Sequence, residues 1–253
     1  MTIELVTLGS SASMPAAGDA CSGYLISSGA TRVLIDCGSG VVAELQKVIP
    51  ICELSAIVIS HFHPDHFIDL VPLRYGLRYG PERAGSPAVY LPPNGIDYLA
   101  RVGQGLRGSD TYFSSTYRLA EYDPARSLEI GDLAIDFRQT THDVPTFAMT
   151  VRAGDRRVGY TADTRASDDL HEFLAGADLL LCESTYPDSL PDLPSDNHLT
   201  SRQAGALAAR TGAGHLVLTH FWPGIERSRF ADDAAQVFAG PVSLAAPGAR
   251  FTT

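Results

Sequence analysis

The sequence predicts an α/β fold, of the α+β kind, with two β-sheets packed face to face and helices on their outer sides. Each half of the 253-residue chain starts with short apolar runs typical of strands and continues into segments with helical spacing. No linker or low-complexity segment separates the two halves. We therefore expect residues 1–253 to form a single domain.

The first half is expected to be rich in strands separated by turns of small residues. Its expected strands are Thr2–Leu8, Gly23–Ser27, Arg32–Cys37, Ser55–Ser60 and Ala88–Leu91. Its expected helices are Val41–Val48, a helix that starts at Pro64, and Gly95–Leu106. The segment Arg101–Ser115, rich in Gly, Ser and Arg, fits either a mobile lid or an ordinary loop.

The second half repeats this order of strands followed by helices. Its expected strands are Leu133–Arg138, Phe147–Ala153, Arg157–Thr161, Ala177–Cys182, Leu216–Thr219 and Val242–Ala245. Its expected helices are Leu199–Ala209 and Arg229–Phe238. Thr200 and Gln203 have the spacing of a capping box at the start of the first of these helices.

Aromatic residues concentrate in the middle of the chain. They are Tyr75, Tyr79, Tyr112, Phe113, Tyr117 and Tyr122. Aromatic packing beneath loops is the expected reason for this concentration. A pocket that stacks a base and a contact between subunits are the alternatives.

The composition limits the partners and the cellular setting. The net charge is −10 and the pI about 5.1, so we do not expect an extended nucleic-acid-binding face. Arginine is the main candidate for binding phosphate outside a metal site, because Lys47 is the only lysine. The four cysteines are scattered without a CxxC pair, which fits a reducing cytoplasm. Neither a signal peptide nor a membrane-spanning run is expected.

The stretch that organises the function is Ser60-His61-Phe62-His63-Pro64-Asp65-His66. It directly follows the apolar run Ala56–Ile59, which is typical of a buried strand. Three imidazoles and one carboxylate therefore lie together at the end of a strand. These side chains are the usual ligands of a divalent metal ion.

The spacing within this stretch predicts how its side chains point. His61 and His63 are two positions apart, so in extended backbone they face the same side. Pro64 keeps His63 extended and suits the first position of a helix. Asp65 and His66 would then lie in the first helical turn, pointing away from the histidine pair. One short segment can thus serve two metal ions.

Further ligands follow other predicted strands. His142, Asp163 and His220 each stand just after an apolar run, where a fold places its site. Taken singly, each also fits a capping or turn residue. Together with the motif they give seven nitrogen or oxygen ligands: His61, His63, Asp65, His66, His142, Asp163 and His220.

With these residues the chain resembles the metallo-β-lactamase superfamily over nearly its whole length. Within it, the chain is similar to the RNase Z-like phosphodiesterase branch, which includes small bacterial cyclic-nucleotide phosphodiesterases. The motifs that carry this likeness are Tyr160-Thr161-Ala162-Asp163-Thr164-Arg165, Cys182-Glu183-Ser184-Thr185, His198-Leu199-Thr200 and Leu218-Thr219-His220-Phe221. The resemblance implies a four-layer αββα sandwich with a dinuclear metal site at one edge.

The resemblance also implies how the ligands are shared. One ion would be held by His61, His63 and His142, and the other by Asp65, His66 and His220, with Asp163 bridging them. A ligand set of imidazole and carboxylate without thiolate suits zinc, and also manganese or iron. Two divalent ions, with zinc as the first choice, are therefore the expected cofactors. Family members are often homodimers, so a homodimer is a further expectation.

The expected reaction is two-metal hydrolysis of a phosphodiester by a hydroxide bound to the metals. The leaving alkoxide needs a proton, for which His198 is the candidate acid. Glu183 would orient His198 and raise its pKa. With Asp65, these two residues complete the predicted catalytic set.

The likeness to RNase Z breaks at one point. RNase Z carries a long arm that grips tRNA between its third and fourth metal motifs, whereas His142 and Asp163 are only 163 − 142 = 21 positions apart. A small phosphodiester such as a cyclic nucleotide is therefore the expected substrate. The alternatives are an RNase Z-like tRNA 3′ endonuclease, or a lactone or thioester hydrolase on the same fold.

Several residues near the motifs have no fixed role. Asp69 fits either a group that orients a ligand or a surface charge. Arg165 fits either a phosphate contact or a surface salt bridge. His171 and His215 are assigned no function.

Overall fold

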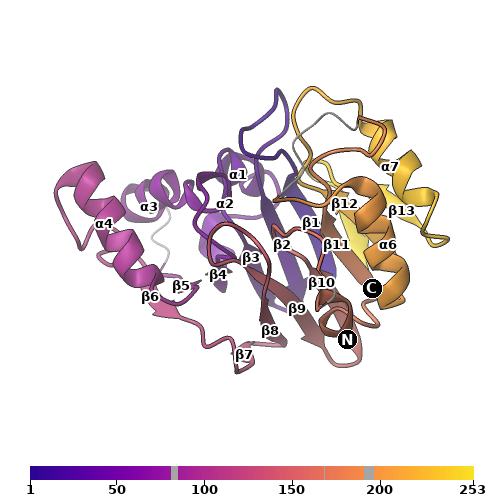
Figure 1. The fold of residues 1–253 in the computed structure, drawn as a ribbon. Coiled ribbons are helices and arrows are strands. Elements are labelled where there is room, and N and C mark those ends of the chain that lie inside the picture. Colours follow the sequence, from indigo (N-terminus) through magenta and orange to yellow (C-terminus); the bar gives the residue numbers. More distant parts are fainter. Residues whose placement is uncertain (81–84, 168, 191–196) are drawn as a thin grey trace.

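The computed structural model describes residues 1–80, 85–167, 169–190 and 197–253. Two seven-stranded sheets pack face to face, and helices cover their outer sides (Figure 1). The predicted αββα arrangement is confirmed. In the described part of the chain, no helix is long and apolar enough to span a bilayer.

The first sheet collects the N-terminal strands and the last strand of the chain. These strands are β1 (Glu4–Gly9), β2 (Gly23–Ser28), β3 (Thr31–Ile35), β4 (Ala56–Val58), β5 (Ala88–Leu91), β6 (Arg118–Glu121) and β14 (Arg250–Thr252). Their order in the sheet is β14-β1-β2-β3-β4-β5-β6. The chain thus returns at its end to pair β14 with β1, in a register that sets Glu4 opposite Thr252.

The second sheet is built from the C-terminal half. Its strands are β7 (Leu128–Ile130), β8 (Leu133–Gln139), β9 (Phe147–Ala153), β10 (Arg156–Tyr160), β11 (Leu179–Glu183), β12 (Leu216–Thr219) and β13 (Val242–Leu244). They lie in the order β13-β12-β11-β10-β9-β8-β7. The strands β10, β11, β12 and β13 are parallel, so their carboxyl ends lie at one edge of the sheet.

Helices fill the outer layers. They are α1 (Val41–Leu45), the 3₁₀ turn η1 (Ile51–Glu53), α2 (Pro64–Phe67), α3 (Leu70–Tyr79), α4 (Gly95–Arg107), α5 (Leu170–Phe173), α6 (Ser201–Thr211) and α7 (Arg227–Ala235). The capping box expected at the start of α6 is present, with Thr200 and Gln203 each bonding the other's backbone N–H.

The helix predicted from Pro64 is in fact two helices. Asp69 stands between α2 and α3, where its backbone N–H donates to Cys37 and its side chain accepts from the N–H of Val42 at the start of α1. Asp69 therefore fixes helix α1 and does not contact a ligand candidate. Both roles considered for it are therefore wrong, because Asp69 neither orients a ligand nor lies at the surface as a solvated charge.

Three short strands escaped the sequence analysis: β6, β7 and β14. Each has only three or four residues and lies at or next to a sheet edge. None of these strands has an alternating pattern of buried apolar and exposed polar residues long enough to predict a strand. Only pairing with a neighbouring strand defines them.

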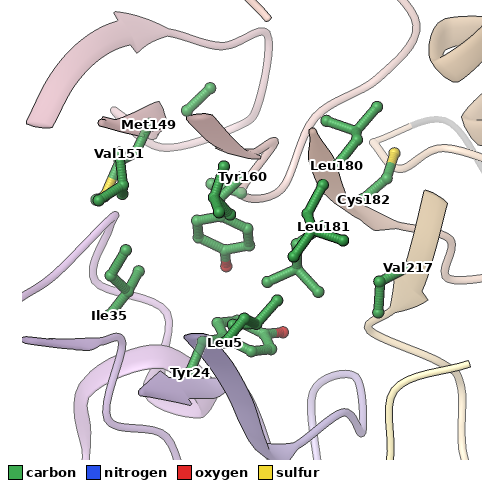
Figure 2. Packing of buried hydrophobic residues seen from close by; sticks show 14 of the residues in the cluster. Leu5, Tyr24, Ile35, Met149, Val151, Tyr160, Leu180, Leu181, Cys182 and Val217 are labelled. Carbon is green, nitrogen blue, oxygen red and sulfur yellow. The ribbon is translucent and has the colours of Figure 1, made fainter. Parts of the chain in front are cut away.

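The interior between the sheets forms the main core. Figure 2 shows Leu5, Tyr24 and Ile35 of the first sheet facing Val151 and Tyr160 of the second. The rings of Tyr24 and Tyr160 meet across the interface, with centroids 5.1 Å apart. Apolar burial and aromatic contact thus fix how the two sheets sit on each other.

The first sheet is buried on its other face as well. Val6, Leu25 and Leu34 alternate along their strands with the residues of the main core and pack into a second cluster beneath helices α1 to α4. Because both faces are covered, the strand ends and loops at the sheet edges are the places left for polar groups.

The aromatic residues of the middle segment divide between core and surface. Tyr112, Phe113, Tyr117 and Tyr122 are buried, as the packing interpretation predicts, while Tyr75 and Tyr79 are exposed. The segment Arg101–Ser115 comprises the end of α4 and a series of turns anchored by Tyr112 and Phe113.

Two glycines within helices give a test of the outer layer. A Cβ at Gly205 of α6 would lie 2.7 Å from the carbonyl oxygen of Ala234 and 2.9 Å from Val237, both packed against α6. We expect Gly205→Ala to lower the free energy of unfolding by about 1–3 kcal/mol, because α7 must move away. Urea denaturation followed by circular dichroism measures this change.

The matched control is Gly105→Ala in α4, where a Cβ would meet nothing within 4 Å. There the better helix propensity of alanine should raise stability by up to about 1 kcal/mol. Equal effects of the two substitutions would contradict the packing of α6 against α7.

Candidate metal centre

The motif that follows β4 adopts the predicted local structure. His63 has φ −69° and ψ 140°, the extended conformation that Pro64 requires, and Pro64 occupies the first turn of α2. Asp65 and His66 are buried in that turn. The two halves of the motif therefore point to different parts of one site.

The structure brings all seven predicted side chains together. Ligand atoms that lie within 4.8 Å of one another form three overlapping groups. Two of them, His61 with His63, His142 and Asp163, and Asp65 with His66 and His220, contain the ligands that the resemblance assigns to the two ions. The third is Asp163, His198 and His220, which brings His198 to the same cluster.

Asp163 lies at the centre of the cluster. Its Oδ2 is 3.6 Å from Nε2 of His61, 3.4 Å from Nε2 of His66 and 3.5 Å from Nε2 of His220. The same oxygen is 3.9 Å from Nε2 of His142. One carboxylate thus faces histidines of both groups, as a bridging residue would.

Second partners turn the histidine rings toward this centre. The Nδ1 atoms of His66 and His220 lie 2.8 Å from Asp36 and Thr185, respectively. Nδ1 of His61 is 3.0 Å from the Ser60 hydroxyl, and Nδ1 of His142 is 3.1 Å from the carbonyl oxygen of Asn197. Hydrogen bonds at Nδ1 leave Nε2 free to bind a metal.

Asp36 is the residue that sequence reasoning missed. It is fully buried at the end of β3 and accepts hydrogen bonds from the Ser60 N–H (2.7 Å), the Ser60 hydroxyl (2.8 Å), His66 Nδ1 and the Tyr160 hydroxyl (2.8 Å). It therefore orients His66 directly, and His61 through Ser60. An isolated aspartate after a strand gives no sequence signal for this role, because Tyr160 comes from the other sheet.

Glu183 has the same function on the opposite side. This buried carboxylate accepts from the backbone N–H of Thr164 (2.7 Å) and the Thr185 hydroxyl (3.0 Å). Its Oε1 lies 3.1 Å from Nδ1 of His198, the partner predicted for it. Thr185 also accepts a hydrogen bond from His220. Glu183 therefore holds His198 directly and His220 through Thr185.

Backbone strain concentrates at the site. Four of the five non-glycine residues with positive φ in the described chain lie here: Ser13 (59°), Asp36 (57°), Ala162 (49°) and His220 (58°). Such conformations are costly and persist where the surroundings impose them. At Ser13 the strained loop aims the backbone N–H at Oδ2 of Asp65, 2.7 Å away.

Three buried polar atoms of the cluster have no hydrogen-bond partner among the described residues. Nε2 of His61, Nε2 of His66 and Oδ1 of Asp163 are buried and make no hydrogen bond. Buried polar atoms are rarely left unsatisfied unless they bind something else. Three such atoms in a cluster of imidazole and carboxylate fit a divalent metal centre.

The charge states of two residues suit metal binding. Burial lowers the pKa of His61 well below its usual value, which keeps the imidazole neutral. Burial alone would raise the pKa of Asp163, but His220 and His66 hold it well below its usual value. A neutral imidazole and an ionised carboxylate are the forms that bind metals.

A cavity of about 270 Å³ opens over the cluster. Its walls are Ser13, His63, Pro64, Asp65, Asp163 and His198. His198 lies at this wall, with its ring centroid 5.2 Å from that of His220. A substrate that enters the cavity would therefore meet both the ligand cluster and His198.

The other candidates lie outside the cluster. Nη2 of Arg165 is 3.4 Å from Oδ1 of Asn197 at the exposed rim. His215 bonds the Ser243 hydroxyl, and His171 lies 3.1 Å from Arg210, so neither belongs to the site.

One carboxylate at the rim of the cluster, Asp143, was not singled out in the sequence. Its Oδ1 lies 3.1 Å from Nε2 of His142.

Comparisons with known proteins agree with this geometry. Residues 31–221 match the family described as a beta-lactamase superfamily domain. The chain is 36% identical over 247 residues to the probable metallo-hydrolase YhfI of Bacillus subtilis, covering 97% of this chain and 98% of YhfI. The crystal structure of YhfI superposes with a TM-score of 0.87 at 30% identity, over 100% of both chains.

More distant relatives extend the comparison. Ribonuclease Z of Streptomyces avermitilis is 30% identical over 260 residues, covering 86% of each chain. The structure of unliganded yeast PDE1 has a TM-score of 0.76 and covers 99% of both chains, but at 14% identity it shares only the fold.

Asp36 provides a test of the site. We expect Asp36→Asn to weaken metal binding about 10–100-fold, because the amide cannot accept the same hydrogen bonds from His66 and Ser60. Competition with a chromophoric chelator measures the affinity, and circular dichroism checks the fold. Asp69→Asn, a second buried aspartate without contact to the ligand cluster, should leave the affinity unchanged. An unaltered affinity in Asp36→Asn would remove Asp36 from the site.

Proposed function

The chain belongs to the metallo-β-lactamase superfamily, and we propose that it is a metal-dependent hydrolase that cleaves a phosphodiester bond in a small substrate. The observation that carries this proposal is the pair of His198 and Glu183 at the wall of the metal cavity. A phosphodiester has an alkoxide leaving group, which needs a proton donor at this position.

The seven clustered side chains are the proposed metal ligands. His61, His63 and His142 would hold one ion, and Asp65, His66 and His220 the other, with Asp163 between them. Zinc is the first choice for the two ions, with manganese or iron as alternatives. Bound there, the ions would supply a nucleophile at neutral pH and polarise the phosphoryl group. Hydrogen bonds that the rings donate from Nδ1 to Ser60, Asp36 and Thr185 would keep these ligands in place.

His198 is the proposed general acid. Its Nδ1 is held by Glu183, so Nε2 is the atom that can give a proton to the leaving oxygen. Burial alone would lower the pKa of His198, but the charge of Glu183 raises it to about 9. The imidazole is then protonated at neutral pH, the form that a proton donor needs.

The shape of the chain favours a small substrate. Between His142 and Asp163, strands β9 and β10 are joined by a tight turn at Gly154, which leaves no room for a long arm. A net charge of −10 adds to this argument, since it disfavours a nucleic-acid polymer. A cyclic nucleotide or a similar small diester is the substrate that we propose.

The relatives support a phosphodiester without identifying it. Ribonuclease Z of Streptomyces avermitilis is 30% identical to the chain. The likeness to ribonuclease Z keeps tRNA 3′ cleavage as a second candidate function. A lactone or thioester hydrolase on the same fold is the remaining alternative, and such a leaving group would not require His198 in the same way.

His198→Ala should separate metal binding from catalysis. We expect turnover of 3′,5′-cyclic AMP to fall about a hundredfold, because the alkoxide then leaves without a proton. The loss should be much smaller for bis(p-nitrophenyl) phosphate, whose phenolate leaves without help. Steady-state kinetics with both substrates, and metal content by mass spectrometry, measure these effects.

The matched control is His215→Ala, which removes a histidine bonded to Ser243 away from the cavity and should retain full activity. Equal losses of His198→Ala on both substrates would contradict the role of His198 as an acid. If the wild type cleaves a lactone or a tRNA precursor but neither phosphodiester, the proposed substrate class is wrong.

Glu183→Gln should change the pH dependence of kcat. The charge of Glu183 raises the pKa of His198, so its removal lowers that pKa. Because the protonated imidazole is the active form, activity is lost as pH rises through this pKa. The alkaline limb of the kcat profile should therefore move to lower pH. A limb at the same pH in both proteins would show that Glu183 does not act on His198.

A further inference from the structure

A buried arginine lies on α3, outside the metal centre. Arg74 is only 8% exposed. Its Nε donates to the carbonyl oxygen of Tyr112 (2.6 Å) and its Nη2 donates to the Ser115 hydroxyl (3.1 Å). The guanidinium lies over the ring of Tyr112, 4.2 Å from the ring centroid. These neighbours satisfy part of its hydrogen bonding, but none of them carries a negative charge.

Arg74 has no counterion among the residues that the structure describes. Within residues 1–80, 85–167, 169–190 and 197–253, no carboxylate oxygen lies within 4.0 Å of Arg74, and the same is true of Arg107 nearby on α4. Buried charges are normally paired, because leaving water is costly for an ion. A buried guanidinium without a counterion is stabilised when an anion binds beside it.

A small cavity lies in front of Arg74. It measures about 200 Å³. Its lining includes Tyr75, Tyr79, Arg107, Ser109 and Tyr112. Among the described residues, the lining thus offers two guanidinium groups and several hydroxyls, and no carboxylate.

The neighbours of Tyr75 in the cavity shift the pKa of its hydroxyl. A hydrogen bond from Tyr112 lowers the pKa of the Tyr75 hydroxyl, and the charges of Arg107 and Arg74 lower it further. The net charge of the chain is −10, so the protein as a whole repels anions. Attraction of an anion to this cavity must therefore come from its two arginines.

We propose that the cavity between α3 and the turns after α4 is a binding site for a phosphate group. The planar guanidinium of arginine binds two phosphate oxygens through two parallel hydrogen bonds, and hydroxyl groups can donate to the remaining oxygens. Arg74 would supply the buried charge and Arg107 the accessible one. The ring of Tyr79, 67% exposed at the rim, offers a surface on which an aromatic group of the ligand can stack.

The ligand is a phosphate monoester or inorganic phosphate. The site shares no residue with the metal centre, so it stands apart from the proposed hydrolysis. Isothermal titration of the metal-loaded full chain with inorganic phosphate, and separately with adenosine 5′-monophosphate, tests it. Tighter binding of the nucleotide would place a nucleoside against Tyr79, and equal affinities would make inorganic phosphate the ligand.

Arg107→Ala is the decisive variant, because Arg107 is exposed and its removal does not disturb the core. We expect this substitution to weaken the binding component at the cavity at least tenfold, as befits the loss of a charged hydrogen-bond donor. Hydrolysis of bis(p-nitrophenyl) phosphate should stay unchanged. Arg74→Lys, which keeps the charge but loses the fork, should also weaken binding.

The control is Arg101→Ala, which removes an exposed arginine of the same helix that does not line the cavity. It should bind phosphate like the wild type. The proposal is overturned if Arg107→Ala binds phosphate as tightly as the wild type. It is also overturned if Arg101→Ala weakens binding to the same extent, since the effect would then come from net charge alone.

Discussion

One buried carboxylate holds the fold and the site together. Asp36 directly follows a strand of the first sheet and is fully buried, so its carboxylate needs several hydrogen-bond donors. The donors come from Ser60 and His66 beside it and from Tyr160 in the second sheet. Satisfying this one charge therefore aligns the two sheets and turns a ligand ring toward the metal centre.

The rest of the site repeats the same principle. Glu183, at the end of a strand of the second sheet, accepts hydrogen bonds from the backbone N–H of Thr164 and from the side chains of Thr185 and His198. The ligand cluster lies between these two anchors, with Asp163 in its middle. Strained backbone at four positions of the site shows that the surrounding structure imposes this arrangement on the loops. A rigid pair of anchors would keep ligand rings and proton donor in place during turnover.

Much of the fold and of the site followed from local sequence. The strands and helices with clear periodicity were predicted close to their observed limits, and the seven side chains after strand ends converge as expected. The short edge strands β6, β7 and β14 were not predictable, because pairing defines them rather than side-chain pattern. Asp36 and the cavity at Arg74 were missed for a related reason. The roles of Asp36 and Arg74 depend on contacts with residues 38 to 124 positions away along the chain, such as Tyr112 and Tyr160.

We propose that the seven clustered side chains hold two metal ions side by side. Anomalous diffraction from crystals of the zinc-loaded protein, recorded at the metal absorption edge, locates such ions. We expect two peaks about 3.5–4 Å apart on either side of Asp163. A single peak, no peak, or peaks away from His61, His66 and Asp163 would contradict it.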